Sequence, residues 1–235
     1  MEKKKTRRKL SKRQKKQLLL EVIILFLATV GAFTIIIVAG SKIADAIGHK
    51  KYKVVEEQPE LDVELLQINN YSRPGTAMDK VNNIVIHYTA NPGTTAMQNR
   101  DYFNGLADSH ITSASAHFIV GLDGEIVQCI PTSEIAYANY PRNNDTVTIE
   151  CCHMDDSGKF NDATYESLIK LTAYLMGKFS LTTDDVIRHY DITIEAGITP
   201  KDCPKYFVDN NDEWEKFKED LEDYIDRYGV VQSQE

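Results

Sequence analysis

Side chains that commonly bind zinc occur at three separated places in the chain, namely His87, His189 and Cys203. Thirteen residues separate His189 from Cys203, and the cysteine lies in a polar loop beside a proline. An inert cysteine is usually buried among apolar residues, so this loop is an uncommon place for one. A catalytic zinc takes three protein ligands and keeps its fourth position for water. The residue types therefore predict a zinc site formed by these three side chains.

A site of this kind would be suited to hydrolysis. Zinc lowers the pKa of a bound water toward about 7, which makes a nucleophile available at neutral pH. Two interpretations of each histidine stay open, because a histidine at the end of an apolar strand is also a common structural residue. The residue types alone predict a zinc hydrolase and leave its substrate undefined.

The elements that must position these residues alternate between strands and helices. Short β-branched runs predict strands at 84–87, 116–120, 126–130, 146–152 and 186–188, with a hairpin turn at 122–125. Apolar residues at helical spacing predict helices at 95–106 and 163–179, the second capped by Asp162, and a terminal helix with a core face at Trp214, Phe217, Leu221, Tyr224, Ile225 and Tyr228. This order is typical of a single α/β domain with a central mixed sheet flanked by helices.

The N-terminal part differs sharply from the rest in charge. Residues 1–53 hold 14 Lys and Arg against 3 Asp and Glu, whereas the remainder holds 13 against 32. Residues 22–40 carry no charge, and as a helix they would span roughly 28 Å, close to the ~30 Å hydrocarbon core of a bilayer. We therefore expect a basic cytoplasmic tail at 1–17 and a single transmembrane helix at 18–40, with the remainder outside the cytoplasm.

Two alternatives to this membrane anchor stay open. Residues 44–46 resemble a signal-peptidase site, so the protein could be secreted after cleavage near Ala46, although the apolar stretch is longer than that of a signal peptide. A buried core helix is the other alternative, but it would have no polar face and would leave the basic flank unexplained. After the span we expect a charged tether at 41–64 and a catalytic domain at 65–230.

The acidic catalytic part argues against several classes of partner. Its net negative charge disfavours non-specific attraction to nucleic acid. Gly121 and Gly124 belong to the predicted hairpin rather than to a phosphate-binding loop, so no nucleotide cofactor is expected. The expected partners are the substrate and, through the N-terminal helix, the membrane.

Five segments of the chain, taken in order, resemble the zinc-dependent N-acetylmuramoyl-L-alanine amidases. They are IVIHYTANPGT, SASAHFIVGLDGEIVQCIP, NNDTVTIECCHMDDSGKFNDATYESL, VIRHYDIT and KDCPKYF. This family includes phage lysozyme-type amidases, bacterial autolysins and peptidoglycan recognition proteins. The resemblance implies a central mixed sheet flanked by helices and cleavage, in peptidoglycan, of the amide between N-acetylmuramic acid and the L-alanine of the stem peptide. With the predicted span, the chain resembles a membrane-anchored bacterial form.

The resemblance also implies a role for each matched residue. His87 and His189 correspond to the two zinc histidines of the family, and Cys203 corresponds to the zinc thiolate. Lys201 corresponds to the lysine that stabilises the oxyanion of the tetrahedral intermediate. It lies two positions before Cys203, so in an extended segment the two side chains would point the same way.

Glu150 is the general base that the resemblance implies. Many family members carry a tyrosine where this chain has Ala116, whereas the autolysin branch carries a glutamate on the strand matched by 146–152. Because side chains alternate along a strand, Glu150 lies on one face and Val147 and Ile149 lie on the other. The carboxylate can therefore face a cleft while the apolar pair fills the core. There it could take a proton from water and pass it to the leaving nitrogen. A strand glutamate that is only exposed or salt-bridged is the alternative.

Several further candidates and two other functions stay open. His117 and His153 could contact substrate or could be structural. Cys129 could form a disulfide with Cys151 or Cys152 outside the cell, and buried thiols are the alternative. The other functions are a non-catalytic peptidoglycan-binding module and a cysteine hydrolase, the latter using Cys151 or Cys152 with His153 or His117.

Overall fold

The computed structural model describes residues 52–232. The predicted basic tail (1–17), the predicted transmembrane helix (18–40) and the first part of the predicted tether lie outside the described residues. Within 52–232, no helix is both long enough and apolar enough to cross a bilayer. Residues 53–232 form one compact unit that contains every candidate site residue named above.

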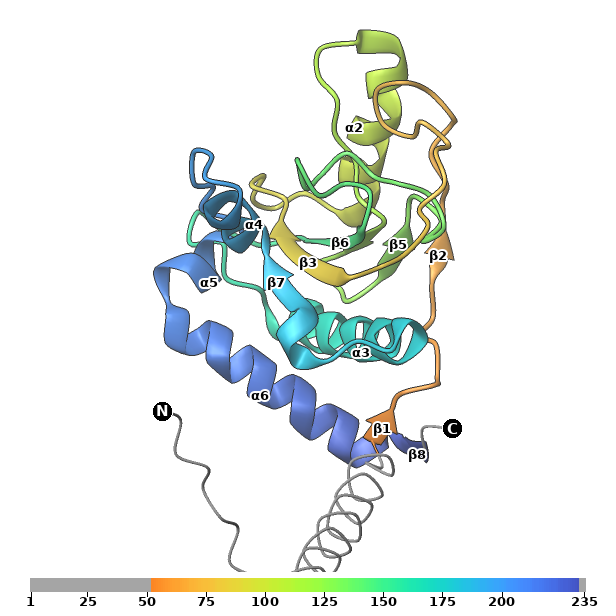
Figure 1. Ribbon diagram of the computed structural model, residues 1–235. Helices are drawn as coiled ribbons and strands as arrows, with labels where there is room; N and C mark the ends of the chain where they lie inside the picture. Colours follow the sequence, from red (N-terminus) through yellow and green to blue (C-terminus); the bar gives the residue numbers. More distant parts are fainter. Residues whose placement is uncertain (1–51, 233–235) are drawn as a thin grey trace, which may run out of the picture. The chain divides into compact units, whose positions relative to one another are not determined.

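A mixed β-sheet lies at the centre of this unit (Figure 1). In the described residues its six strands follow the order β2-β5-β4-β6-β3-β7. Their bounds are β2 (Asp62–Val63), β3 (Asn83–Tyr88), β4 (Phe118–Val120), β5 (Ile126–Gln128), β6 (Thr146–Cys151) and β7 (Val186–Arg188). β4 and β5 pair antiparallel, and the other neighbouring pairs are parallel. The predicted mixed sheet is therefore confirmed.

The central strands form where the sequence places runs of β-branched residues. Ile84, Val85 and Ile86 of β3 are fully buried, so both faces of this strand are covered. Central parallel strands read as continuous apolar runs for this reason. β6 pairs with β3 in a register that places Glu150 opposite His87. The pairing of these two strands thus sets the position of two candidate site residues.

Helices cover both faces of the sheet, as predicted. α2 (Ala96–Ser109) packs on one face and α3 (Asp162–Phe179) on the other, with α6 (Asn211–Tyr228) outside α3 (Figure 1). Each face has its own apolar cluster. Phe103 and Leu106 of α2 belong to one, and the second combines Leu168 and Leu171 of α3 with Phe217 of α6.

Side-chain caps determine where α2 and α3 begin. Thr95 Oγ1 accepts the backbone N–H of Gln98, and the Gln98 side chain accepts the backbone N–H of Thr95 in return. Asn161 caps α3, since its Oδ1 accepts the N–H of Thr164 at 2.9 Å. The prediction that Asp162 is this cap is wrong by one residue. Asp162 is instead the first helical residue, where its negative charge interacts favourably with the positive end of the helix dipole.

The segment predicted as a tether, residues 41–64, is folded from Tyr52 onward. β1 (Tyr52–Val54) pairs with β8 (Val230–Gln232) in a separate two-stranded sheet. Val55 is buried, and β2 joins the edge of the main sheet beside β5. Strands of two or three residues with mixed polarity carry no measurable period, which is why the sequence did not reveal them.

Short helices flank β7. The 3₁₀-helix η1 (Thr183–Asp185) precedes it, α4 (His189–Glu195) follows it directly, and α5 (Lys205–Asp209) leads into α6. None of them was predicted, because one or two turns show too few apolar repeats. α4 begins at His189, so a strand-to-helix junction presents this side chain.

Candidate functional site

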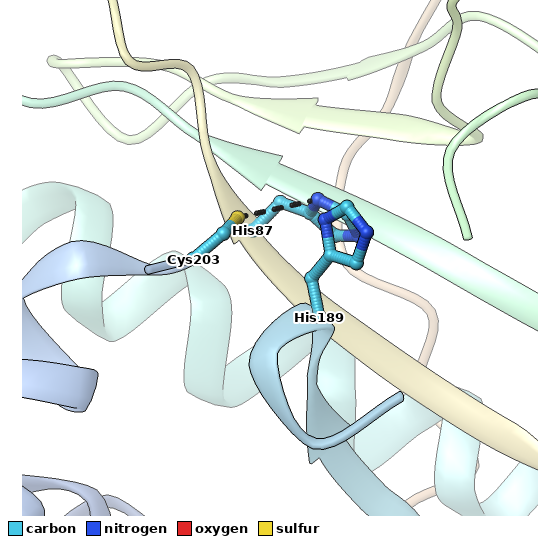
Figure 2. A group of neighbouring side chains, drawn as sticks. All are labelled: His87, His189 and Cys203. Atoms are coloured by element: carbon cyan, nitrogen blue, oxygen red, sulfur yellow. Dashed lines mark hydrogen bonds between the residues drawn. The ribbon is translucent and has the colours of Figure 1, made fainter. Parts of the chain in front are cut away.

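The three predicted metal ligands lie together at one edge of the sheet. His87 is near the end of β3, His189 is the first residue of α4, and Cys203 lies in the loop before α5 (Figure 2). One ligand atom from each lies within 4.8 Å of the others, and Cys203 Sγ is 3.4 Å from His87 Nδ1. All three residues are buried. Two nitrogens and a sulfur arranged in this way could hold a metal ion.

The sheet explains why residues far apart in the sequence meet here. β6, β3 and β7 are adjacent and parallel, so their carboxyl ends lie at the same edge. Open α/β sheets form their ligand sites at this edge. His87 and Glu150 come from neighbouring positions in the register, and His189 follows the end of β7.

The short helix α4 holds several site residues in place through backbone atoms. The N–H of Tyr190 donates to the carbonyl of Cys203 at 2.9 Å. One turn along, Thr193 Oγ1 accepts the N–H of Lys201 at 3.1 Å. Thr193 is fully buried, and its hydroxyl donates to the carbonyl of Tyr190. The positions of Cys203 and Lys201 are therefore tied to the helix that begins with His189.

The start of α4 is fixed by a charged pair. Asp191 accepts the backbone N–H of Arg188 at 2.8 Å, and its carboxylate also accepts two bonds from the Arg188 guanidinium. Arg188 in turn donates to the carbonyl of Phe207 at 3.0 Å. Asp191 thus caps the turn that presents His189.

Asn139 determines the tautomer of His87. The amide nitrogen of Asn139 donates its two hydrogens to Thr146 Oγ1 at 2.8 Å and Thr148 Oγ1 at 2.7 Å. Its Oδ1, 2.6 Å from His87 Nε2, must therefore be an acceptor. His87 carries its proton on Nε2, and the lone pair of Nδ1 faces Cys203 and the metal position.

The orientation of the Asn139 amide is itself fixed by its surroundings. The Thr146 hydroxyl donates to the carbonyl of Arg142 at 2.7 Å, so Thr146 Oγ1 can accept from Asn139. Sequence reasoning missed this residue, which lies in an irregular segment 52 positions from its histidine partner. Its only local signal is a polar side chain shortly before a buried strand.

Glu150 faces the same centre. Its Oε1 is 3.7 Å from His87 Nδ1, and its Oε2 is buried without a hydrogen-bond partner in the described part of the chain. Burial raises the pKa of Glu150 to about 8. Val147 and Ile149 point into the apolar cluster on the α3 side, as the predicted strand alternation requires.

The contact between His87 and Glu150 is not an ion pair at neutral pH. Burial and the neighbouring His189 lower the pKa of His87 to about 3. Burial, followed by the charge of Lys201, lowers the pKa of His189 to about 4. Both imidazoles are therefore neutral, which is the form that binds metal ions. A cation bound between them would favour the ionised form of Glu150.

Cys203 also requires a nearby positive charge to ionise. Burial and the proximity of Glu150 raise the pKa of the Cys203 thiol well above its usual value. The backbone N–H of Tyr88 and the charge of Lys201 act in the opposite direction. A bound metal ion would deprotonate such a thiol outright. The site is therefore suited to a cation and poorly suited to a free thiolate.

Of the histidines in residues 52–232, His87 and His189 line the cleft at this centre, whereas His117 and His153 do not. His117 Nδ1 accepts the N–H of Thr148 at 3.0 Å, so its Nε2 donates to the carbonyl of Glu134 at 2.9 Å. With both nitrogens bound to backbone and no exposed surface, His117 is structural. The structure therefore gives no support to a contact between His117 and substrate.

His153 is also engaged elsewhere. Its Nδ1 bonds to the carbonyl of Asp155 at 2.7 Å, and its ring packs against Tyr88 with centroids 5.1 Å apart. The ring is buried, so it presents no surface to the cleft. The predicted substrate contact of His153 is likewise not supported.

The remaining cysteines are free and buried. Cys151 belongs to the apolar cluster on the α3 side of the sheet, whereas Cys129 and Cys152 belong to the α2 side. The disulfide considered from the sequence is thus absent. Burial raises the pKa of Cys152 to about 12 and that of Cys151 well above its usual value, so neither is a thiolate nucleophile. This argues against the cysteine hydrolase.

A cleft of about 730 Å³ opens over the three metal ligands. We call it the ligand cleft and define it by His87, Glu150, Lys201, Tyr102, Thr112 and Tyr137, which line it with the rest of the centre. Lys201 is exposed at its rim, as expected for a group that meets a substrate. The structure thus brings together five of the seven predicted site residues.

Comparison with known sequences points to one family. The sequence model of the family described as N-acetylmuramoyl-L-alanine amidase (Amidase_2) matches residues 77–206. The amidase CwlL of Bacillus licheniformis is 30% identical over 173 residues, which are 68% of this chain and 46% of the relative. The amidase BlyA of Bacillus subtilis (strain 168) is 33% identical over 174 residues, which are 65% of this chain and 44% of the relative. The chain spans about half the length of these relatives.

Solved structures agree with this comparison. A mutant endolysin from Bacillus subtilis is 26% identical, with a TM-score of 0.56 over 70% of this chain and 99% of that one. The catalytic domain of XlyA is 25% identical, with a TM-score of 0.55 over 69% of this chain and 99% of that one.

Proposed function

The chain belongs to the N-acetylmuramoyl-L-alanine amidase family, and from this premise we propose that it hydrolyses the amide between N-acetylmuramic acid and the L-alanine of the stem peptide in peptidoglycan. The observation that carries the proposal is the convergence of His87, His189 and Cys203 beside Glu150 in one cleft. A binding module would need no such group of ligands beside a buried carboxyl group.

Zinc is the ion that we propose for this centre. Tetrahedral zinc, with Zn–S of about 2.3 Å and Zn–N of about 2.0 Å, places sulfur and nitrogen roughly 3.5 Å apart. The separation of 3.4 Å between Cys203 Sγ and His87 Nδ1 fits this geometry. The Nδ1 lone pair of His87 is directed to the same point. When bound, zinc would polarise the scissile carbonyl and lower the pKa of an attacking water.

Glu150 is the group that we propose to move the proton. Its buried carboxyl group lies beside the ligands, and its Oε2 has no partner among the described residues. It would accept the proton of the attacking water and transfer it to the nitrogen that leaves with L-alanine. A bound cation would keep the carboxylate ionised before the first transfer, and burial would stabilise its protonated form between the two transfers.

Lys201 would stabilise the negative charge that develops on the carbonyl oxygen. Lys201 is exposed and lines the ligand cleft, and its backbone N–H is held by Thr193. A preorganised cation at that position lowers the energy of the tetrahedral intermediate more than that of the planar amide. Lys201 therefore contributes to rate rather than to ground-state binding.

We also propose that the protein is anchored in the cell membrane by one helix, with the N-terminus in the cytoplasm and the amidase domain outside. The support is the uncharged run at 22–40 behind a strongly basic flank. Extraction of the full chain from membranes tests it: release by high salt or alkali without detergent would contradict the anchor. A shortened N-terminus on the isolated protein would indicate cleavage near Ala46.

The experiment that tests the activity uses the full chain in detergent and purified peptidoglycan. We measure new L-alanine amino termini and new reducing sugar ends, with a chelator and after zinc is restored. Zinc-dependent amino termini without reducing ends are expected. Binding to peptidoglycan with no new termini under any metal condition would contradict the enzyme and leave a recognition module.

The Glu150→Gln variant sharpens this test. We expect kcat to fall by about 10²- to 10⁴-fold, because the amide side chain cannot accept the proton. Zinc content should stay that of the unmodified protein, since Glu150 is not one of the three ligands. An unchanged kcat would exclude Glu150 as the base.

A further inference from the structure

Arg188 lies beside the two chain segments that carry His189 and Cys203. It is the last residue of β7, so it directly precedes His189 at the start of α4. Cys203 directly precedes Pro204, the residue that caps α5. Thirteen residues separate the two ligands in the sequence, so their separation in space depends on non-covalent contacts between the two segments.

The Arg188 guanidinium contacts both segments at once. On the His189 side, its Nε and Nη2 donate to the Asp191 carboxylate at 3.1 and 2.8 Å. On the Cys203 side, its Nη1 donates to the carbonyl of Phe207 in α5 at 3.0 Å. The side chain of Arg188 is only 11% exposed, and hydrogen bonds are stronger where water is largely excluded. One side chain thus spans the two ligand segments.

The same guanidinium also contacts the C-terminal helix α6. Its Nη1 donates to Oδ1 of Asn211, the first residue of this helix, at 3.2 Å. The indole ring of Trp214 lies 5.3 Å from the guanidinium carbon. Trp214 is itself buried against Phe207 and Phe217, with ring centroids 5.4 and 5.3 Å apart. α6 therefore adds one hydrogen bond and one cation–π contact to the position of Arg188.

These contacts require the shape of an arginine side chain. Of the five N–H groups of the guanidinium, four donate to three separate acceptor residues. A lysine ammonium is a compact charge without a planar fork, so it could not reach Asp191, Phe207 and Asn211 together. Arg188 therefore does more than neutralise the charge of Asp191.

We propose that Arg188 is a positioning residue for the metal centre, through which α6 helps to set the separation of His189 and Cys203. This inference rests on the zinc centre proposed above. Ligands that are already held at the right spacing lose little conformational entropy when an ion binds. Without the Arg188 hydrogen bonds, part of that ordering would take place only on metal binding, and the affinity for zinc would be lower.

The test measures the zinc affinity of the full-length protein in detergent by competition with a chromophoric chelator. Arg188→Lys should lower the affinity by about 10- to 100-fold, the range for outer residues that orient metal ligands. The absorption spectrum of the cobalt(II)-substituted variant should also differ from that of the unmodified protein, because it depends on the geometry of the nitrogen and sulfur ligands. A merely structural role would leave this spectrum unchanged.

Arg73→Lys is the matched control. Arg73 donates twice to the carboxylate of Glu134, at 2.8 and 2.7 Å, and once to the carbonyl of Leu66, at 2.8 Å. Its side chain is 12% exposed, close to the value for Arg188, yet none of these three residues lines the ligand cleft. Both lysine variants should lower the free energy of unfolding of the metal-free protein, whereas only Arg188→Lys should change the zinc affinity.

Asn211→Ala measures the share of α6. Asn211 is exposed, so this variant should fold even if Arg188→Lys does not. It removes one acceptor of the guanidinium, and the zinc affinity should fall by roughly 2- to 10-fold, the size of one ordinary hydrogen bond. Glu215→Ala, at another exposed position of the same helix, should leave the affinity unchanged.

The outcomes separate this inference from the proposed function. Weaker zinc binding and a changed cobalt spectrum in Arg188→Lys, with both unchanged in Arg73→Lys, support the positioning role. Unchanged zinc affinity in both Arg188→Lys and Asn211→Ala overturns it and leaves the zinc amidase standing. An equal loss of affinity in Arg188→Lys and Arg73→Lys also overturns it, because general destabilisation would then be the cause. An unmodified protein that binds no zinc would overturn the proposed centre itself, and this inference with it.

Discussion

The end of β3 and the start of β4 each bury a histidine, and the two differ in what their ring nitrogens bind. His117, before β4, has both nitrogens paired with backbone groups. His87, on β3, has one nitrogen committed to Asn139, and the other is directed at His189 and Cys203. Burial is the same in both regions, so burial alone does not mark a functional histidine. The partners of each ring nitrogen do.

Electrostatics does not separate the two regions either. Burial lowers the pKa of His87 to about 3 and that of His117 to about 4, so both rings are neutral at physiological pH. A neutral ring has one donor and one acceptor nitrogen. In His117 the acceptor is used by the N–H of Thr148, whereas in His87 it points into the ligand group.

The largest expected effect comes from removing the histidine on β3. In His87→Ala we expect zinc content to fall to background and kcat/KM to fall on the order of 10³-fold, since several kcal/mol of charge stabilisation are lost. Metal analysis of the purified protein and release of amino termini measure the two quantities. His117→Gln, which can keep both hydrogen bonds, should retain zinc. Loss of zinc in both variants would remove the distinction.

The second expected effect is a dependence of the free energy of unfolding on pH, and it is caused by His117, the histidine before β4. The unfolded chain protonates His117 near its ordinary pKa of 6.5, whereas the folded protein resists protonation until about pH 4. The unfolded state therefore binds more protons in this window, and the free energy of unfolding falls as pH drops from 6.5 to 4. The contribution of His117 is about 3 kcal/mol.

Urea unfolding at several pH values, with a chelator present, measures this contribution. The chelator keeps the metal ligands of all samples in the same state. His117→Gln should show a shallower fall than the unmodified protein between pH 6.5 and 4. Equal slopes would show that His117 is not kept neutral by the fold.

The smallest expected effect comes from Asn139, the hydrogen-bond partner of His87, which His117 lacks. Asn139→Ala removes the acceptor for His87 Nε2–H, and loss of such an outer partner costs about 10- to 100-fold in metal affinity. Asn139→Asp keeps an acceptor and should lose less. Competition with a chromophoric chelator measures the affinity. Asn82→Ala, whose side chain bonds to Asp145, is the control, and an affinity loss there equal to that of Asn139→Ala would contradict the role.

The sequence predicted the helices and strands whose residue types follow a regular pattern. β3 and β6 carry continuous β-branched runs, and α3 carries apolar residues at helical spacing, so their positions could be predicted. β1, β2 and α4 are too short to show a period. Their existence depends on contacts outside the elements themselves, such as β8 for β1 and the loop at Lys201 for α4.

The candidate site divides in the same way. The grouping of His87, His189 and Cys203 near Glu150 could be predicted, because each of these residues ends or lies on a recognisable strand or matches a family segment. Asn139 could not, since its role comes from a tertiary contact in an irregular segment. The sequence could not assign His117, because a histidine beside a strand gives the same pattern in two cases: its ring nitrogens can face a cleft, or they can bond to the backbone. In the structure they bond to the backbone.

The hydrogen bonds made by α4 position the residues of the candidate site when the protein folds. Tyr190 and Thr193 hold Cys203 and Lys201 through backbone hydrogen bonds, next to His189 on the same helix. The conformational entropy lost in bringing these groups together is therefore lost once, when the chain folds. In the proposed reaction, the backbone of Lys201 and Cys203 would therefore already be in position when the substrate binds.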